Sequence, residues 1–257
     1  MKCSLFLFVA FFGLVTTAQV NEVDDQGRKQ GKWEKLYEGT RVYMYRGQFK
    51  DDIPVGKFVY FYRSQKVKAV INHNVVETGR SVAFYYHEEN GKTMSYGIYR
   101  NMKKDSVWTN FTPSGRLSST ETFKNGELDG IKSIYFIPDL RSDRSIVVST
   151  TMNYSDGALN GAYQEFFLSK RLKLRGQFEN NQRVGAWEAF HANGNRSSTV
   201  RYNDGVKHGY TIAYDTSGKR IGEQMYHFGK RIQGKRLENL LKQLEEKGIN
   251  PYTMEAK

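Results

Sequence analysis

The sequence has almost no cysteine. Its single copy, Cys3, lies at the extreme N-terminus, so the remainder of the 257-residue chain has no thiol to form a disulfide, a thiolate metal site or a cysteine nucleophile. Cys3 also precedes the apolar N-terminal segment, which is the wrong side for acylation after signal cleavage. Stability must therefore come from packing, although only 39% of the residues are hydrophobic.

Long apolar runs are also missing. The run from Leu5 to Val15 has 11 residues, whereas a membrane-spanning helix needs about 20. Lys2 precedes this run and the small residues Thr16–Ala18 follow it, an order typical of a signal peptide. We expect residues 1–18 to be removed, leaving no transmembrane span in a chain that is periplasmic, secreted or associated with the cell surface.

Recognisable catalytic motifs are absent as well. The sequence contains no H-E-x-x-H, no G-x-S-x-G, no P-loop and no G-x-G-x-x-G. The histidines are scattered, and none lies beside a second ligand at metal-binding spacing, so we expect structural or solvent-exposed roles for all of them. The acidic pairs 51–52 and 88–89 are expected in turns. The sequence therefore predicts a protein that is not an enzyme and binds neither cofactor nor metal.

Aromatic residues and glycine are abundant and regularly spaced. From Gly185, the residues at offsets 2, 5, 9, 17, 20 and 24 are tryptophan, phenylalanine, glycine, tyrosine, glycine and glycine. The same pattern returns without gaps from Ser106, Gly161 and Gly209, and with short insertions from four further positions. The eight starting residues are 25, 23, 27, 24, 31, 24 and 24 residues apart, and they are Gly31, Gly56, Gly79, Ser106, Gly130, Gly161, Gly185 and Gly209. A period of this length indicates a repeat architecture.

Each repeat is predicted to be a β-hairpin. Turn dipeptides such as Asn125-Gly126 separate two short aromatic or β-branched runs. In the returning run 172–178, apolar and polar residues alternate, so one face packs and the other meets water. The predicted fold is all-β: an elongated array of about eight consecutive antiparallel hairpins over residues 19–229 that forms a single twisted sheet. The expected structural aromatics are Trp33, Phe58, Trp108, Tyr163, Trp187, Tyr202 and Tyr226.

The repeat pattern stops after Gly229. Leucines at 237, 240, 241 and 244 fall on one face of a predicted helix, with Gly248 and Pro251 just beyond it. We interpret residues 230–257 as an amphipathic helix and tail that cap the last sheet edge, because an uncovered edge strand promotes aggregation. A helix that binds a groove on a partner is the alternative.

The pattern G-x-W-x-x-[FY]-x-x-x-G, followed by an aromatic residue and a glycine, resembles the bacterial variant of the MORN repeat found in the YwqK-type antitoxin family. The resemblance covers residues 31–229. It implies a single-layer antiparallel sheet used for protein contact and, in eukaryotic relatives, for proposed contact with membrane lipid. An export signal does not suit neutralisation of a cytoplasmic toxin, but it suits an immunity role in the envelope.

Positive charge is concentrated in the C-terminal half. Of the net +12, residues 170–236 carry +9, from 14 lysine and arginine residues against 5 acidic ones. These cations either attract an anionic lipid or polysaccharide or simply form a soluble outer face. A second candidate contact is the long loop 137–145. The candidate binding residues of both are Lys173, Arg175, Arg196, Arg201, Lys219, Arg220, Arg141 and Arg144.

These features favour an exported, non-enzymatic scaffold that binds an envelope or exported protein. The first alternative is a peripheral binder of anionic lipid or glycan through its basic half, and the second is an immunity-type partner of an exported toxin. We expect no nucleic-acid partner, because the chain is predicted to leave the cytoplasm.

Overall fold

A computed structural model describes residues 19–74, 77, 79–137 and 146–256. The predicted signal peptide lies outside these residues, and so do Arg141 and Arg144 of the candidate contact loop. Within them, 19 strands form one continuous antiparallel sheet, and a single helix follows near the C-terminus. The predicted all-β fold is confirmed.

The strands are short, between two and nine residues each. Their bounds are β1 (Glu22–Val23), β2 (Lys29–Leu36), β3 (Tyr43–Lys50), β4 (Ile53–Phe61), β5 (Val67–His73), β6 (Arg80–Tyr86), β7 (Thr93–Arg100), β8 (Lys103–Phe111), β9 (Leu117–Lys124), β10 (Glu127–Tyr135), β11 (Val148–Ser155), β12 (Ala158–Phe166), β13 (Leu172–Glu179), β14 (Gln182–Phe190), β15 (Arg196–Asn203), β16 (Val206–Lys207), β17 (Gly209–Tyr214), β18 (Arg220–His227) and β19 (Lys230–Ile232). The helix α1 (Lys235–Glu246) precedes the small hairpin β20 (Ile249–Asn250) and β21 (Glu255–Ala256).

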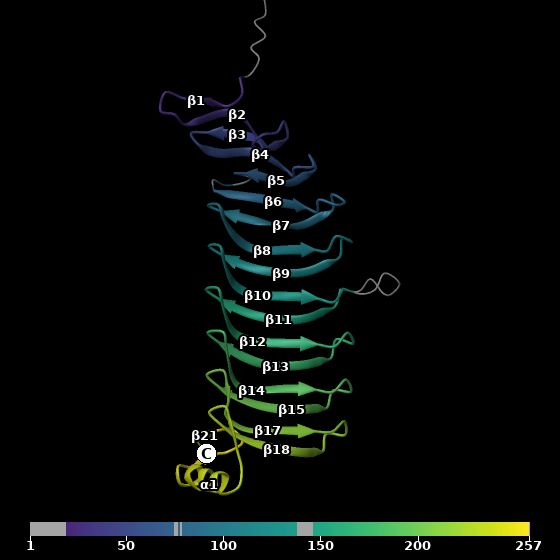
Figure 1. Cartoon of the computed structure of the whole chain (residues 1–257), viewed down its shortest axis with the longest axis vertical. Helices are drawn as coiled ribbons and strands as arrows, with labels where there is room; N and C mark the ends of the chain where they lie inside the picture. The colour runs from purple at the N-terminus through teal and green to yellow at the C-terminus, as the bar shows by residue number, and fades with distance from the viewer. Residues whose placement is uncertain (1–18, 75–76, 78, 138–145, 257) are drawn as a thin grey trace, which may run out of the picture.

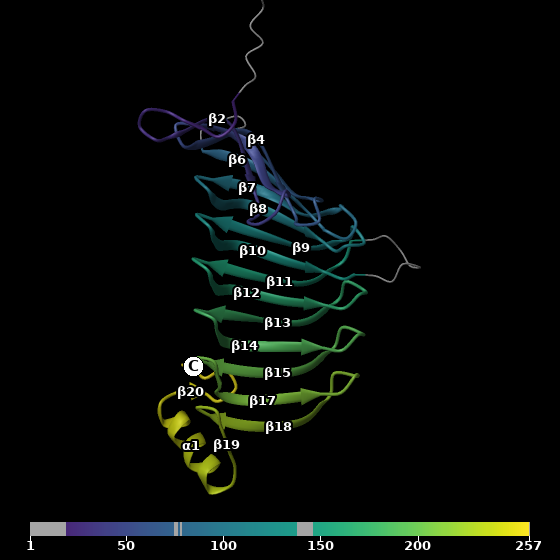
Figure 2. The same ribbon diagram turned by 45° about the horizontal axis from the view of Figure 1, so that its top comes forward.

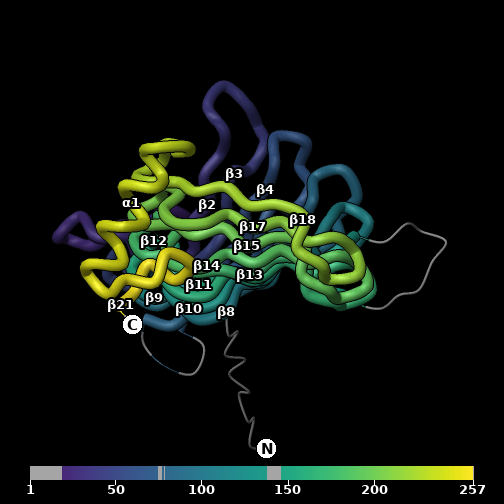
Figure 3. The backbone as a smooth tube through the Cα atoms, turned by 90° about the horizontal axis from the view of Figure 1, so that it is seen from below, coloured from purple at the N-terminus to yellow at the C-terminus, as the bar shows by residue number. Residues whose placement is uncertain are grey.

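From β1 to β19, strands that follow one another in the sequence pair with each other, except that β16 and β17 both pair with β15 and not with one another. The sheet is therefore a simple meander whose strands stack along the long axis of the molecule, from β1 at one end to α1 at the other (Figure 1). Seen from the end, the hairpin loops of the first strands fan out while those of the last strands overlie one another (Figure 3). The N-terminal strands thus turn away from the plane of the rest (Figure 2).

The first glycine of the repeat is required by a bulge. Where β14 pairs with β13, Arg175 faces Glu188 and Gln177 faces Val184, so three residues of β14 lie opposite one residue of β13. Gly185, in the bulge, has a φ of 64°, a left-handed conformation that glycine adopts without steric cost. Ser106 occupies the equivalent position in β8 with a φ of 58°.

The third repeat begins at Ser81 rather than at Gly79. Ser81 pairs with Tyr99, as Gly185 pairs with Tyr202, whereas Gly79 lies in the turn before β6 with a φ of 81°. The pairing of β5 with β6 has no bulge, so this position does not need a glycine. With this correction, the first four repeats begin 25 residues apart.

One face of the sheet, the ring face, carries Trp33, Phe58, Trp108, Tyr163 and Trp187. A Cβ atom added to Gly47, Gly97 or Gly176 would lie 2.4, 2.3 or 2.2 Å from the ring of Phe58, Trp108 or Trp187, respectively. Three rings thus rest directly on a glycine of the preceding strand. Phe58, Trp108 and Trp187 are at most 2% exposed, which confirms that large aromatic rings provide much of the burial.

The loops on one side of the sheet are also connected to one another. The Tyr37 hydroxyl donates to the Phe61 carbonyl at 2.7 Å, and the Tyr62 hydroxyl donates to the Tyr86 carbonyl at 2.8 Å. His87 and His191 occupy the same place in their repeats and contact a carbonyl of the next loop, at 3.1 and 3.0 Å. These two histidines therefore have the structural role expected from the sequence.

The C-terminal helix packs on the last hairpin, on the face opposite the ring face. Leu244 of α1 is 6% exposed and forms a buried cluster with Tyr210 of β17 and Met225 of β18. Leu237, Leu240 and Leu241 pack against this cluster, as the spacing of the leucines predicts.

Candidate functional site

The predicted basic residues lie on neighbouring strands, but most of them are paired with acidic side chains. Glu188 of β14 accepts from Arg175 at 2.6 Å and from Arg196 at 2.7 Å. Lys173 pairs with Glu165 at 3.1 Å. Cross-strand pairing of this kind holds the strands in register and reduces the positive charge available to a ligand.

Two further members of this group turn toward the C-terminal segment. Arg201 lies 3.8 Å from Glu255, and its side chain is only 19% exposed. Arg220 pairs with Glu223 and lies over the ring of Tyr252. Lys219, in the loop before β18, has no ion pair among the described residues and is exposed. The six candidate residues that the structure describes are therefore not gathered into one unpaired basic surface.

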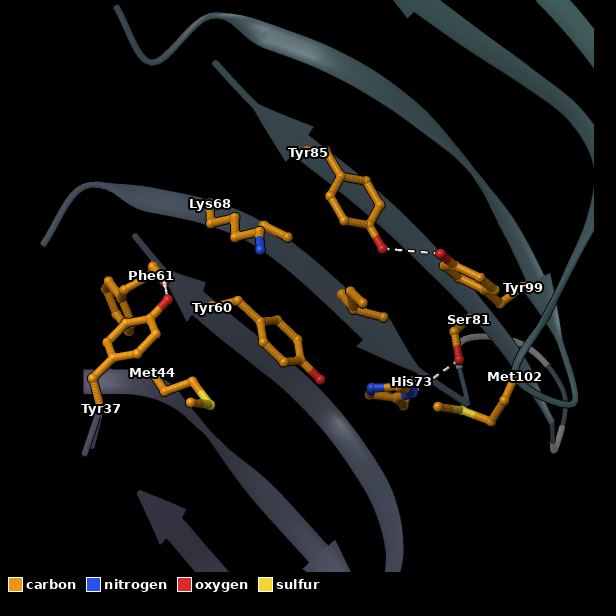
Figure 4. A pocket seen from close by; sticks show the side chains of 12 residues that line it. Tyr37, Met44, Tyr60, Phe61, Lys68, His73, Ser81, Tyr85, Tyr99 and Met102 are labelled. Carbon is orange, nitrogen blue, oxygen red and sulfur yellow. Dashed lines mark hydrogen bonds between the residues drawn. The ribbon is translucent and has the colours of Figure 1, made fainter. Parts of the chain in front are cut away.

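A partly enclosed site lies instead on the ring face of the N-terminal third. It is a cavity of about 530 Å³ between strands β4 to β7, lined mainly by aromatic and apolar side chains (Figure 4). Such a volume is within the range that binds small molecules or a single projecting side chain. The lining residues are Tyr37, Met44, Tyr60, Phe61, Lys68, Ala69, Ile71, His73, Ser81, Tyr85, Tyr99 and Met102.

One cross-strand row runs along the floor of the cavity. Tyr45 on β3 pairs with Tyr60 on β4, which pairs with Ala69 on β5, which pairs with Tyr85 on β6. Tyr45 and Tyr60 are in ring contact, with centroids 5.9 Å apart. Ala69 has only a methyl group at the next place in the row, and this residue is 2% exposed.

His73 closes one end of the cavity. It occupies the position that is phenylalanine or tyrosine in the other repeats, it is 6% exposed, and its ring packs edge-on against Phe58 at 5.0 Å. Its Nδ1 is hydrogen-bonded to Ser81 Oγ at 2.9 Å. Its Nε2 has no partner among the described residues, and Figure 4 shows the imidazole and the Tyr60 hydroxyl pointing toward one another.

Burial favours the neutral forms of three groups that line the cavity. Burial lowers the pKa of the His73 imidazole below its usual value. Burial also raises the pKa of Tyr60. Burial, reinforced by the hydrogen bond between the Tyr85 and Tyr99 hydroxyls at 2.9 Å, raises the pKa of Tyr85 well above its usual range. Lys68 is the only formally charged residue in the lining.

A second aromatic feature lies on the opposite face. Phe84, Tyr96 and Phe111 form a continuous stack, with centroids 5.8 Å apart for the first pair and 5.9 Å for the second. We call these three residues the aromatic patch. Tyr96 is 39% exposed, and no other element covers the patch in the described part of the chain.

Sequence reasoning missed both aromatic features. It placed the rings on a repeat, but the order of residues along one strand does not show which side chains stand beside them on the neighbouring strands. The glycines beneath the buried rings could have been found from the sequence. Gly47, Gly97 and Gly176 each lie 11 residues before the aromatic residue that packs on them.

Among the described residues, no group of three or more histidine, cysteine or acidic side chains is arranged to hold a metal ion. No helix in the described ranges is long and apolar enough to cross a membrane.

No family model matches this chain. No curated protein matches it either. Among solved structures, the chain is similar to a variant of S. aureus TarM in complex with fondaparinux, alpha-GlcNAc-glycerol and UDP, at 12% identity and a TM-score of 0.24. The match covers 61% of this chain and 22% of that one, so the chain spans about a fifth of the length of that protein. A TM-score this low supports no inference about fold or activity.

Proposed function

We propose that this protein is a non-enzymatic scaffold that binds another protein of the cell envelope, and that the aromatic patch is the centre of the contact. The observation that carries this proposal is the stack of Phe84, Tyr96 and Phe111 on an uncovered sheet face. Partly exposed, mutually stacked aromatic rings are the usual anchors of protein interfaces.

The residues on the C-terminal side of the patch are more polar than the patch itself. The cross-strand row of Phe84 and Tyr96 continues through Val70 and Val59 on the N-terminal side and through small or polar residues on the C-terminal side. These are Thr109, Thr120, Ser133, Thr151 and Gln164. An apolar centre bordered by a long polar surface is the arrangement of a protein contact site rather than of a membrane-inserting surface.

The alternative, attraction to anionic lipid or glycan, rests on the basic residues of the C-terminal half. The pairing of Arg175 and Arg196 with Glu188 favours the scaffold proposal, because ion-paired cations contribute little long-range attraction. An immunity-type role is one form of the same scaffold proposal, in which the bound protein is an exported toxin.

Capture of the partner from a native envelope extract tests the proposal. Replacing Tyr96 with lysine should abolish capture, since loss of an interface anchor weakens binding by about 30-fold or more. Gln164→Lys is the matched control, because it adds the same charge on the same face in a later strand. A partner retained by Tyr96→Lys, or lost equally with both variants, contradicts the proposal.

The lipid alternative is tested with vesicles that contain anionic phospholipid. Under the scaffold proposal, the triple variant Lys173→Glu, Arg175→Glu and Arg196→Glu should still capture the protein partner. Salt-sensitive co-sedimentation of the unmodified protein with these vesicles, lost in the triple variant, would support the alternative instead.

A further inference from the structure

We propose that the partner segment that contacts the aromatic patch is acidic, and that its carboxylates lie against Lys66 and Lys92 at the rim of the patch. This inference rests on the proposed function, because it concerns the same face of the sheet and adds the chemistry of the bound protein. It is carried by the shape of the surface beside the patch and by the charges of the loops that border it.

Two shallow depressions lie next to one another on this face, and Gly91, in the loop between β6 and β7, lines both of them. The apolar part of the first is formed by Val67, Val70 and Tyr86, and that of the second by the three rings of the aromatic patch. Val67 is 38% exposed and Tyr96 is 39% exposed. A Cβ atom added to Gly91 would meet nothing within 4 Å. Apolar side chains of a partner therefore have two accessible places to pack.

The loops around the two depressions carry an excess of positive charge. Residues 62–68, 87–92 and 112–116 contain five lysine and arginine residues and two glutamates, which gives a net charge of +3. Lys66 lines the first depression and Lys92 lines the second. Both lysines are exposed, and neither forms an ion pair with any residue that the structure describes.

The two ammonium groups are held in place without being neutralised. Lys66 Nζ donates to the Glu89 carbonyl at 3.3 Å, and Lys92 Nζ donates to the Ser114 carbonyl at 3.1 Å, in each case across to the next loop. A carbonyl oxygen carries only a partial charge, and each ammonium group has two further N–H bonds to donate. In the C-terminal half, by contrast, two arginines share the carboxylate of Glu188. Carboxylates of a partner therefore find two positioned cations beside the patch.

Two acidic side chains in the same loops limit this attraction. Glu88 accepts a hydrogen bond from the Ser64 hydroxyl at 2.8 Å, and Glu89 is the one acidic residue that lines either depression. The five cations outnumber these two glutamates, so a basic segment would meet a surface of its own sign. A segment that combines carboxylates with apolar side chains matches both the charge and the apolar lining.

Selection of a random peptide library displayed on phage against the purified protein tests the chemistry of the partner. We expect the enriched peptides to combine a net negative charge with an aromatic or aliphatic residue, and to bind poorly to Tyr96→Thr, which carries the residue that follows Tyr96 in the cross-strand row. Enriched peptides that require Tyr96 but are neutral or basic overturn this inference and leave the aromatic patch as a contact site. Peptides that bind Tyr96→Thr equally well contradict the proposed function too. If no peptide is enriched, this inference fails, whereas capture from the envelope extract still decides the proposed function.

Charge reversal separates the two lysines from the rings. The double variant Lys66→Glu and Lys92→Glu should bind an enriched peptide about tenfold more weakly or worse, and it should lose the decrease in affinity that the unmodified protein shows as salt is raised. Arg171→Glu with Lys219→Glu is the matched control, because these cations end the equivalent loops of later repeats. Arg171 also donates to a carbonyl of the next loop, that of Ala192, at 3.0 Å. Equal affinity of the two double variants for the peptide overturns the inference.

Two milder changes keep the test valid if charge reversal disturbs the loops. Lys66→Gln with Lys92→Gln retains a side-chain donor at each carbonyl and removes only the charge, so binding of the same peptide should weaken by about threefold or more. Glu89→Gln removes the opposing charge from the lining and should strengthen binding by up to about fivefold. Unchanged affinity in both of these variants, with melting temperatures like that of the unmodified protein, would show that charge at the rim does not select the partner.

Discussion

At the scale of single residues, the repeat that begins with Ser106 has a serine where the bulge of other repeats has a glycine. Ser106 has a φ of 58°, at a bulge where Gly56 and Gly185 each have a φ of 64°. A side chain in this left-handed region costs about 1 to 2 kcal/mol, part of which is regained because glycine is more flexible in the unfolded chain.

We therefore predict that Ser106→Gly stabilises the protein, by about 0.5 to 1 kcal/mol. The reciprocal change, Gly185→Ser, should destabilise it by a similar amount. Thermal unfolding of the two variants beside the unmodified protein measures both effects. A lower melting temperature for Ser106→Gly would show that the serine hydroxyl, which donates to Asp105 at 2.8 Å, matters more than the backbone.

The glycines beneath the rings are predicted to be sites where a larger side chain destabilises the protein through a steric clash. Gly176→Ala places a methyl group against the Trp187 ring, where the nearest ring atom would be 2.2 Å away. Displacing a buried indole should destabilise the protein by about 1 to 3 kcal/mol. Gly222→Ala is the matched control, because nothing lies within 4 Å of its added Cβ and its φ is ordinary. Chemical denaturation that gives equal midpoints for the two variants would contradict this packing.

His73 predicts how stability depends on pH. Burial lowers its pKa in the folded state, so the unfolded state binds more protons as the pH falls below the usual value of 6.5. Its contribution is present above that pH and is lost as the pH decreases. Melting temperatures between pH 7.5 and 5 should fall less for His73→Phe than for the unmodified protein. A residual slope is expected from His208, whose pKa is lowered by burial and by nearby His227.

The other titratable side chains that line the cavity are those of Tyr37, Tyr60, Lys68, Tyr85 and Tyr99. Burial raises the pKa of Tyr60 and that of Tyr85, so neither adds to the slope between pH 7.5 and 5. Identical slopes for the unmodified protein and His73→Phe would show that the imidazole is not held neutral.

At the scale of whole elements, the period of the sequence was enough to predict the hairpins. It did not predict which side chains from neighbouring strands lie next to one another. Turn dipeptides such as Asp204-Gly205 were sufficient to predict the position of a turn, because both residues have positive φ values in the structure. The floor of the cavity contains Tyr60, Ala69 and Tyr85, which are adjacent only through the register of three strands. Bulges shift that register by amounts that the sequence alone does not reveal.

The predicted place of the third repeat was wrong for a related reason. Gly79 lies two residues before Ser81. Because most repeats begin with a glycine, the sequence pattern favours Gly79 as the first residue of the third repeat. β6 pairs with β5 without a bulge, so the repeat continues there without the residue that marks it elsewhere.

The helix α1 has a testable part in stability. Leu244 is 6% exposed and contacts the buried side chains of Tyr210 and Met225. Leu244→Ala should destabilise the protein by about 2 to 5 kcal/mol, the usual range for a buried leucine. Asn239→Ala, on the exposed side of the same helix, should have little effect. Equal denaturation midpoints for the two variants would mean that the helix does not protect the last hairpin.

At the scale of the whole molecule, length follows from strand number. A meander of 19 strands at about 4.8 Å per step is about 80 Å long, since β16 and β17 lie in line. A compact sphere of the same chain length has a diameter of about 45 to 50 Å. Small-angle scattering should therefore give a maximum dimension near the larger value. A value near the smaller one would show that the array folds back on itself or packs more compactly in solution.

The open meander also has a mechanical consequence. Each strand is joined only to its neighbours, and no second layer spans several strands along the described sheet to lock their relative rotation. A small change of twist between each pair of neighbouring strands therefore adds up from one end of the sheet to the other. A contact that changes the twist between two strands near β5 would rotate the first hairpins with respect to α1, so binding at one place on the sheet would be transmitted as a change in the direction of the N-terminal end.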